Sequence, residues 1–112
     1  MPLYMSTFGY KPEVWAELIH SPENRTETVS RILENAGCKL KGLWYAFGES
    51  DGFALIEAPD NVTSASLAIA ISASGAFRKF ETTVLITQDE LLKALEKAQD
   101  VEYVAPGATI HA

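Results

Sequence analysis

The segment Cys38–Ala58 reads CKLKGLWYAFGESDGFALIEA and contains two runs of β-forming residues separated by a polar turn. The first run, CKLKGLWYAF, covers residues 38–47, and the second, FALIEA, covers residues 53–58. Glycines lie at both ends of the turn Gly48–Gly52, and glycine adopts backbone angles that other residues avoid. Two strands joined by so short a turn are expected to pair as an antiparallel hairpin.

A strand and helical sequence precede this hairpin. Leu3–Tyr10 (LYMSTFGY) is rich in β-forming residues and alternates like a strand. The apolar spacing of residues 12–36 predicts one bent helix, or a short helix followed by a longer one, with a break at Ser21-Pro22 where Ser21 can cap the second part. Gly37 is the expected left-handed stop.

A second helix and a fourth strand follow the hairpin. Residues 62–74 predict a helix of small side chains that begins after an Asp60 cap and ends at Gly75. Phe77–Ile86 predicts the fourth strand. A further helix begins at the capping box Thr87–Glu90 and is amphipathic through Leu91, Leu92, Leu95 and Ala98.

The element order βαββαβ specifies a fold. Right-handed crossovers place both helices on one face of a single antiparallel sheet, which is the ferredoxin-like arrangement. The prediction is therefore an α+β protein with one ferredoxin-like domain over residues 1–99, including the C-terminal helix, and a tail over residues 100–112. The length of 112 residues suits one domain.

The predicted strands are apolar on both sides, although helices cover one face only. Counting along residues 38–47 puts Leu40, Trp44 and Ala46 on one side and Leu43, Tyr45 and Phe47 on the other. In the next strand, Ala54, Ile56 and Ala58 suit close packing against the helix of small residues, which leaves Phe53, Leu55 and Glu57 facing outward. A second copy of the chain is the simplest cover for the outer face, so a homodimer packed sheet to sheet, a dimeric α+β barrel, is expected.

Composition excludes several classes of partner. The net charge of −6 disfavours nucleic acid, and the basic residues Lys39, Lys41, Arg78 and Lys79 lie beside acidic ones. No apolar run approaches the about 20 residues of a membrane span, and no signal-peptide pattern begins the chain. Cys38 is the only cysteine, so a disulfide within the chain is impossible and a cytoplasmic location is expected.

Several motifs in a fixed order resemble one family. They are MPLYMSTFGY at the start, Pro22-x-x-Arg25, Gly42-x-Trp44-Tyr45-x-x-Gly48-x-x-Asp51, Ile56-Glu57-Ala58-Pro59-Asp60, Ser74-Gly75-Ala76-Phe77 and Thr82-Thr83. Together they resemble the GYD domain family over roughly residues 1–98. The Gly-Tyr-Asp triplet of the name is altered here to Glu49-Ser50-Asp51. The resemblance implies kinship with dimeric α+β barrel proteins, a group that includes cofactor-independent monooxygenases and haem-handling enzymes, but no settled activity.

Six residues are candidates for a ligand pocket: Tyr4, Phe8, Arg25, Tyr45, Asp51 and Glu57. Asp-Gly is a preferred turn pair, so Asp51 is expected mainly to bind its local backbone, with a general base or ligand contact as the alternative. Tyr45 can donate a hydrogen bond to a ligand on the dimer side, although aromatic core packing is commoner. Tyr4 and Phe8 share one face of their strand with Tyr10 and can line the same cavity.

Arg25 is expected to pair with a carboxylate, such as Glu57, Glu49 or Asp51, because a cation gains nothing from the N-terminal end of a helix. No metal site and no cofactor are predicted, since His20, His111 and Cys38 lack the spacing of a ligand set.

Three functions fit this pattern. The first is a homodimeric binding or accessory protein with a small hydrophobic pocket between sheet and helices. The second is a cofactor-independent monooxygenase or isomerase that acts on a small aromatic substrate through Tyr45, Asp51 and Glu57. The third is a structural assembly module. An enclosed pocket with a polar group of perturbed pKa discriminates among them.

Overall fold

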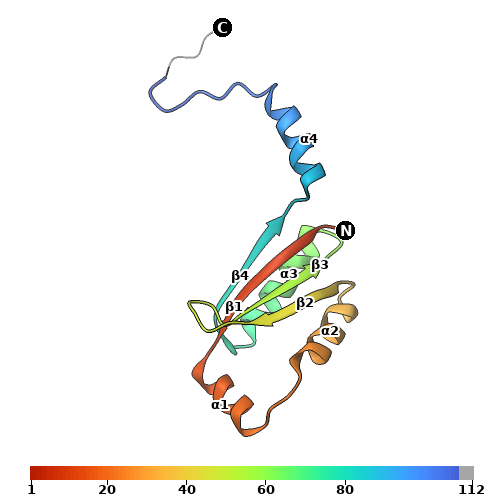
Figure 1. Cartoon of the computed structure of the whole chain (residues 1–112), viewed down its shortest axis with the longest axis vertical. Coiled ribbons are helices and arrows are strands. Elements are labelled where there is room, and N and C mark those ends of the chain that lie inside the picture. Colours follow the sequence, from red (N-terminus) through yellow and green to blue (C-terminus); the bar gives the residue numbers. More distant parts are fainter. Residues whose placement is uncertain (109–112) are drawn as a thin grey trace.

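A computed structural model describes residues 1–108 of the chain, so His111 lies outside the described residues. Figure 1 shows the elements in their order along the chain. They are β1 (Leu3–Tyr10), α1 (Pro12–His20), α2 (Arg25–Asn35), β2 (Lys39–Tyr45), β3 (Gly52–Glu57), α3 (Asn61–Ala73), β4 (Phe77–Leu85) and α4 (Gln88–Ala98). The helical sequence before the hairpin therefore forms two helices rather than one.

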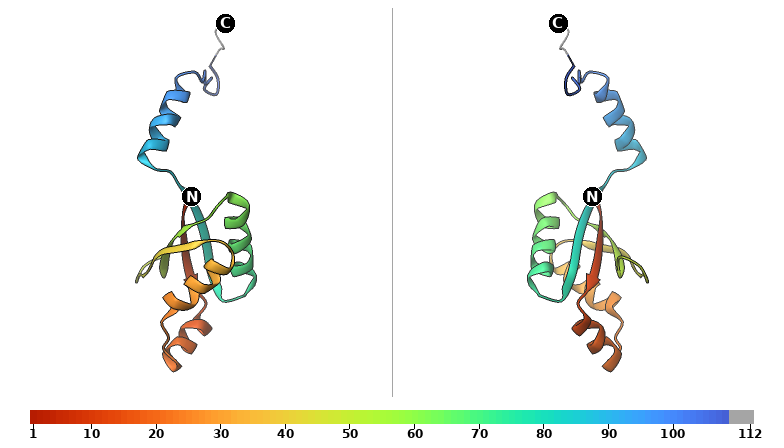
Figure 2. Two further views of the ribbon diagram at one scale, coloured as in Figure 1. Left: turned by 90° about the vertical axis from the view of Figure 1, so that its right-hand side faces the viewer. Right: turned by 90° about the vertical axis from the view of Figure 1, so that its left-hand side faces the viewer.

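The strands form one antiparallel sheet in the order β2-β3-β1-β4. Helices α2 and α3 lie on the same side of this sheet (Figure 2). The core between them contains Tyr4, Leu33, Cys38, Ala54, Ile56 and Ala58, and Leu67 of α3 packs against it. This arrangement confirms the predicted ferredoxin-like α+β fold, and Ala54, Ile56 and Ala58 lie on the helix side as expected.

Local signals at the helix ends are confirmed with one exception. Asp60 caps α3 by accepting a hydrogen bond from the Thr63 N–H, and Thr87 and Glu90 form the predicted capping box of α4. Gly37 and Gly75 have φ values of 78° and 79°, the left-handed conformation that ends the helices before them. The exception is α2, which begins after an Asn24 cap and not at Ser21.

A β-bulge in β2 overturns one prediction about its two sides. The pairing with β3 shifts between Leu40 and Gly42, and an extra residue at a bulge reverses the alternation beyond it. Leu40 therefore shares the helix side with Leu43 and Tyr45, while Trp44 lies on the outer side. Tyr45 consequently faces the helices and not the side expected to meet a second copy.

The outer face of the sheet has no helix over it and is apolar at its centre. It carries Met5 of β1 opposite Leu55 of β3, which are half-buried, and Trp44, whose exposed fraction is 54%. Glu57 lies on this face and pairs with Lys41 at 3.6 Å.

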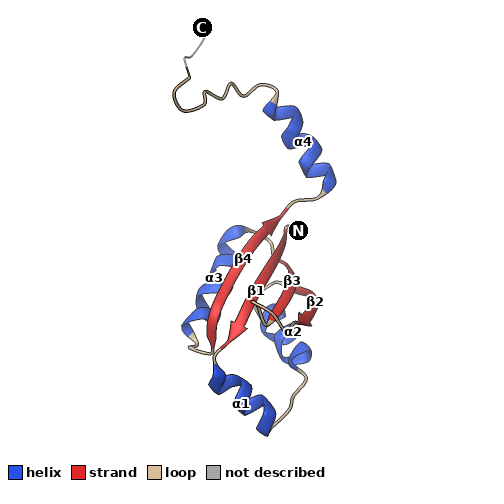
Figure 3. Cartoon of the chain, turned by 60° about the vertical axis from the view of Figure 1, so that its left-hand side comes forward, coloured by secondary structure: helices blue, strands red, loops and turns tan. Residues whose placement is uncertain are grey.

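Helix α4 stands beyond one end of the sheet, and α1 lies beyond the other end (Figures 1 and 3). The chain therefore measures 66 × 31 × 23 Å along its principal axes. Among the described residues, no helix combines the length and the apolar character that crossing a membrane requires.

Gly52 has a role in packing that differs from the predicted role in turn geometry. Neither Gly48 nor Gly52 has a positive φ. Instead, a Cβ atom on Gly52 would overlap the ring of Phe8, which lies against the backbone of β3. Gly48 has open space around the equivalent position. The absence of a side chain at Gly52 thus fixes where Phe8 lies.

We expect Gly52→Ala to destabilise the fold by about 1–3 kcal/mol, because the new methyl group forces the Phe8 ring to move within a packed interior. The measurement is the free energy of unfolding in urea. Gly48→Ala is the matched control and should change this free energy by less than about 0.5 kcal/mol. Equal effects of the two variants would contradict the packing role.

Candidate functional site

Aromatic rings from four elements meet at the end of the sheet next to α1. We call this group the aromatic chamber; its rings are Phe8, Tyr10, Trp15, Tyr45 and Phe77. The ring centroid of Tyr10 lies 5.2 Å from that of Trp15 and 5.2 Å from that of Phe77. Such distances are those of packed aromatic pairs, so the chamber has stiff walls.

Two tyrosine hydroxyls form the polar part of the chamber. The Oη atoms of Tyr10 and Tyr45 are 3.2 Å apart, within hydrogen-bonding distance. Burial raises the pKa of Tyr45 well above its usual range, and the hydrogen bond with Tyr10 raises it further. Tyr45 therefore stays neutral at physiological pH, where its hydroxyl acts as a hydrogen-bond donor or acceptor and not as a general base.

A cavity of about 60 Å³ lies between these rings and the helices. Its lining is almost entirely apolar, with Val29 and Leu33 of α2, Leu43 of β2 and Ile71 of α3 among the aliphatic contributors. A water molecule occupies about 30 Å³ in the liquid, and a cavity of about 150 Å³ is known to hold benzene. The inner cavity alone thus accommodates only part of a ring-sized molecule.

Two wider hollows adjoin the inner cavity at Arg25. One, of about 360 Å³, includes Trp15, Tyr45 and Phe47, and the other, of about 230 Å³, includes Tyr10 and Phe77. Arg25 lines both hollows and the inner cavity. Arg25 therefore lies where the apolar inner cavity meets the two wider hollows.

The partner of Arg25 differs from the predicted ones. Its Nη1 atom lies 3.5 Å from Oε2 of Glu23, and its side chain is 30% exposed. Arg25 therefore pairs with a carboxylate, as expected, but the partner is Glu23 and not Glu57, Glu49 or Asp51. Glu23 lies only two residues before Arg25, just ahead of the Asn24 cap. The 3.5 Å contact between them is long, so it holds the Arg25 side chain weakly at the edge of the hollows.

Asp51 supports the chamber from outside. Its Oδ2 atom accepts hydrogen bonds from the Tyr10 backbone N–H at 2.9 Å and from Trp15 Nε1 at 3.4 Å, and it pairs with Arg78 at 3.3 Å. The predicted local turn contact is wrong, because all these partners lie far away in sequence. Burial by itself raises the pKa of Asp51, but the Tyr10 N–H and the Arg78 charge outweigh burial and hold this pKa below its usual value.

The remaining candidates lie apart from the chamber. Glu57 is on the outer face of the sheet, where it pairs with Lys41. Tyr4 is buried at the opposite end of the helix side, and its hydroxyl donates to Asn61 Oδ1 at 2.7 Å. The structure thus brings Phe8, Arg25 and Tyr45 together around one cavity. Asp51 does not line this cavity but contacts Tyr10 and Trp15 of the chamber. The set Tyr45, Asp51 and Glu57, predicted for the enzyme hypothesis, does not share one cavity.

Sequence reasoning missed the contributions of Trp15, Phe77 and Arg78. Trp15 falls within the apolar spacing of residues 12–36, and nothing in that spacing shows that its indole reaches Asp51. Ser50, in the altered family triplet, is buried and accepts a hydrogen bond from Lys79 Nζ at 3.1 Å.

Within residues 1–108, no group of three or more His, Cys, Asp or Glu side chains is close enough to hold a metal ion.

Comparison with known proteins identifies the family. The model of the GYD domain matches residues 4–95, which is most of the chain. The chain belongs to the GYD domain family. A solved structure, the crystal structure of FFRP-DM1, superposes with a TM-score of 0.50 and is 15% identical; the alignment covers 77% of this GYD protein and 100% of that chain. At such identity the likeness supports the fold alone. No curated protein matches the sequence.

The Asp51 contacts predict a pH-dependent stability. Because the pKa of Asp51 is lower in the folded than in the unfolded chain, its contribution is complete above the unfolded value and is lost as pH falls through the folded value. We expect Asp51→Asn to lower the free energy of unfolding by about 1–3 kcal/mol at pH 7 and to flatten its decline below about pH 4.

The measurement is urea unfolding at pH values between 3 and 7. Glu49→Gln is the control, because the Glu49 side chain is 93% exposed and contacts Lys79 at 3.6 Å. An unchanged pH profile in Asp51→Asn would contradict the assigned role.

Proposed function

We propose that this GYD protein is a homodimeric small-molecule-binding protein whose ligand occupies the aromatic chamber. The observation that carries the proposal is the convergence of two tyrosine hydroxyls and one guanidinium on a hollow that is otherwise aromatic and aliphatic. Ligand sites commonly have this character: an apolar lining with a few polar groups that fix orientation.

The lining indicates what kind of ligand fits. An aromatic ring can stack in the hollow beside Trp15 and extend toward the inner cavity, where Tyr45 offers a hydrogen bond. A carboxylate on that ring would reach Arg25, whose present ion pair with Glu23 is long and partly exposed. Arginine binds carboxylates through paired N–H donors, so a small aromatic acid is the favoured class.

The ligand enters past α1. This helix contains no buried residue, and Trp15, Val14 and Leu18 line the two hollows on its inner side. The larger hollow, of about 360 Å³, already exceeds the cavity of about 150 Å³ that holds benzene, so an aromatic ring fits there without displacing Trp15.

We expect 2-naphthoate to raise the melting temperature, since a ligand that binds only the folded state stabilises it. Arg25→Gln should weaken naphthoate binding about tenfold, equivalent to about 1.4 kcal/mol, and change binding of the neutral 2-naphthalenemethanol less than about twofold. The measurements are thermal shift and quenching of tryptophan fluorescence. Arg31→Gln, an exposed change on the same helix, is the control.

Two results would overturn the chamber as a site for aromatic acids. One is the absence of any shift with millimolar naphthoate. The other is an equal loss of affinity for the acid and the alcohol in Arg25→Gln.

The homodimer part of the proposal rests on the outer face of the sheet. Its apolar centre, formed by Met5 and Leu55, has no helix over it. The salt-bridged Lys41 and Glu57 lie toward one margin of this face, so a charged pair borders the apolar centre on that side. That pattern is typical of protein interfaces, and a two-fold pairing makes the face complementary to itself.

We expect light scattering to give about twice the chain mass of 12.2 kDa at micromolar concentration. Leu55→Glu should shift the protein toward monomer, because it places an unpaired charge in the centre of the interface. Val62→Glu, at a position that is 80% exposed on α3, is the control and should leave the mass unchanged. Circular dichroism verifies that both variants fold. A monomeric wild-type protein would contradict the dimer.

A further inference from the structure

Helix α4 has an apolar side that nothing in its own chain covers. Leu91, Leu92 and Leu95 lie on one side of the helix with exposed fractions of 39%, 50% and 54%. The charged residues Asp89, Glu90, Lys93, Glu96 and Lys97 lie on the other side, at the positions that a helical period assigns them. All residues of α4 are exposed, and the helix stands clear of the sheet (Figure 1).

The exposed surface of one chain is too large for a compact monomer. The chain exposes 8060 Å², whereas a folded monomer of 12.2 kDa is expected to expose about 6,100 Å². The radius of gyration is 18.7 Å, against about 13 Å for a compact domain of this length. The excess of about 2,000 Å² per chain comes with α4 and the segment after it, which stand clear of the sheet, and it exceeds the about 800 Å² that each partner contributes to a standard interface.

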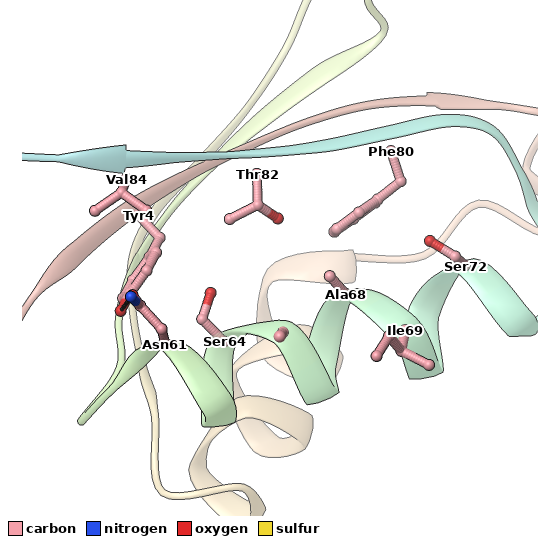
Figure 4. Close-up of a pocket in the computed structure, with 10 residues that line it drawn as sticks. Tyr4, Asn61, Ser64, Ala68, Ile69, Ser72, Phe80, Thr82 and Val84 are labelled. Atoms are coloured by element: carbon pink, nitrogen blue, oxygen red, sulfur yellow. Dashed lines mark hydrogen bonds between the residues drawn. The ribbon is translucent and has the colours of Figure 1, made fainter.

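The same chain has an apolar groove between α3 and β4. Its volume is about 550 Å³, and Figure 4 shows side chains of β4 and α3 pointing toward one another across it. Phe80, Thr82 and Val84 of β4 form one wall, and the small residues Ala65 and Ala68 form part of the other. Val84 is 55% exposed, so the groove is open to solvent at this end.

The groove and the apolar side of α4 match in chemistry and length. The residues that line the groove carry no charge, and the leucines of α4 form a stripe without charge. The 11 residues of α4 span about 16 Å, and the 13 residues of α3 beside the groove span about 20 Å. Small residues on α3 allow a leucine-bearing helix to approach closely, as ridges pack into grooves.

We propose that α4 of each chain docks into the α3–β4 groove of a second copy, so that the dimer exchanges its C-terminal helices. The proposal rests on the homodimer part of the proposed function and not on ligand binding. Two identical exchanges satisfy both grooves and both helices at once, which closes the assembly at two chains. The exchange also covers surface that the outer sheet face alone leaves exposed.

A return of α4 to the groove of its own chain is disfavoured by the start of the helix. Thr87 accepts a hydrogen bond from the Glu90 N–H at 3.1 Å, and its own N–H donates to Glu90 Oε1 at 3.0 Å. These bonds fix the first turn of α4, which leaves only the Leu85–Ile86 junction to reverse the chain direction. Figure 3 shows α4 continuing beyond the end of β4 and away from α3.

Disulfide trapping between chains tests the exchange. Two copies with tags of different size are co-expressed, one with Ala68→Cys in the groove and the other with Leu95→Cys in the apolar stripe. Mild oxidation and a non-reducing gel then measure the disulfide between the two tagged chains. Lys93→Cys, on the charged side of α4, replaces Leu95→Cys in the control. Cys38 is 5% exposed and remains in place in all variants.

We expect the Ala68–Leu95 combination to give at least five times the cross-linked heterodimer of the Ala68–Lys93 combination. Equal yields, or no cross-link, would overturn the exchange. So would a double variant that closes its disulfide within one chain. The result is distinguishable from the other tests. An absent cross-link in a protein that light scattering shows to be dimeric overturns the exchange alone, whereas a cross-linked dimer that survives Leu55→Glu overturns only the sheet-face interface.

Discussion

The carboxylate of Asp51 is the contact on which the candidate site depends. It lies in the turn just before β3, yet it accepts a hydrogen bond from the last residue of β1, contacts the indole of Trp15 on α1 and pairs with Arg78 on β4. Three elements that wall the chamber are therefore held by one side chain. Charge-assisted hydrogen bonds of this kind are stronger than neutral ones, particularly where water is partly excluded. This anchor holds the end of β1 that carries Tyr10, whose hydroxyl lies 3.2 Å from that of Tyr45.

The sheet divides the molecule into two sides with different tasks. On the helix side, close packing at Gly52 and Phe8 and the bulge in β2 direct Phe8 and Tyr45 into one cavity. On the outer side, the same strands present Met5, Leu55 and Trp44 without a cover. Any four-stranded sheet with helices on one face has a second face that its own chain leaves uncovered. Where that face is apolar, a partner surface commonly covers it. The proposed ligand site lies on the helix side, and the proposed sheet-to-sheet contact lies on the outer side.

Much of the fold could be predicted because its signals are local. Asp60, Gly37, Gly75 and the Thr87–Glu90 capping box each act within one helix turn, and the hairpin and the order βαββαβ then determine the topology. The site was harder, because its contacts join residues far apart in sequence. The bonds from Asp51 to Tyr10 and Trp15 span 41 and 36 residues, so no spacing rule finds them. The bulge at Leu40–Gly42 likewise reverses the alternation of side chains along β2, so a strict period of two puts Tyr45 on the wrong side of the sheet.

The stability of α4 links sequence, fold and assembly. An isolated helix of 11 residues is marginal in water, since nucleation is costly and few hydrogen bonds repay it. This helix has every local aid: a capping box, Asp89 and Glu90 at its positive end and Lys97 at its negative end. These aids are together worth about 1–3 kcal/mol, less than burial of three leucine side chains provides. A sequence that fixes the start of α4 so firmly and yet keeps an uninterrupted leucine stripe favours a helix that gains its remaining stability by docking on another surface.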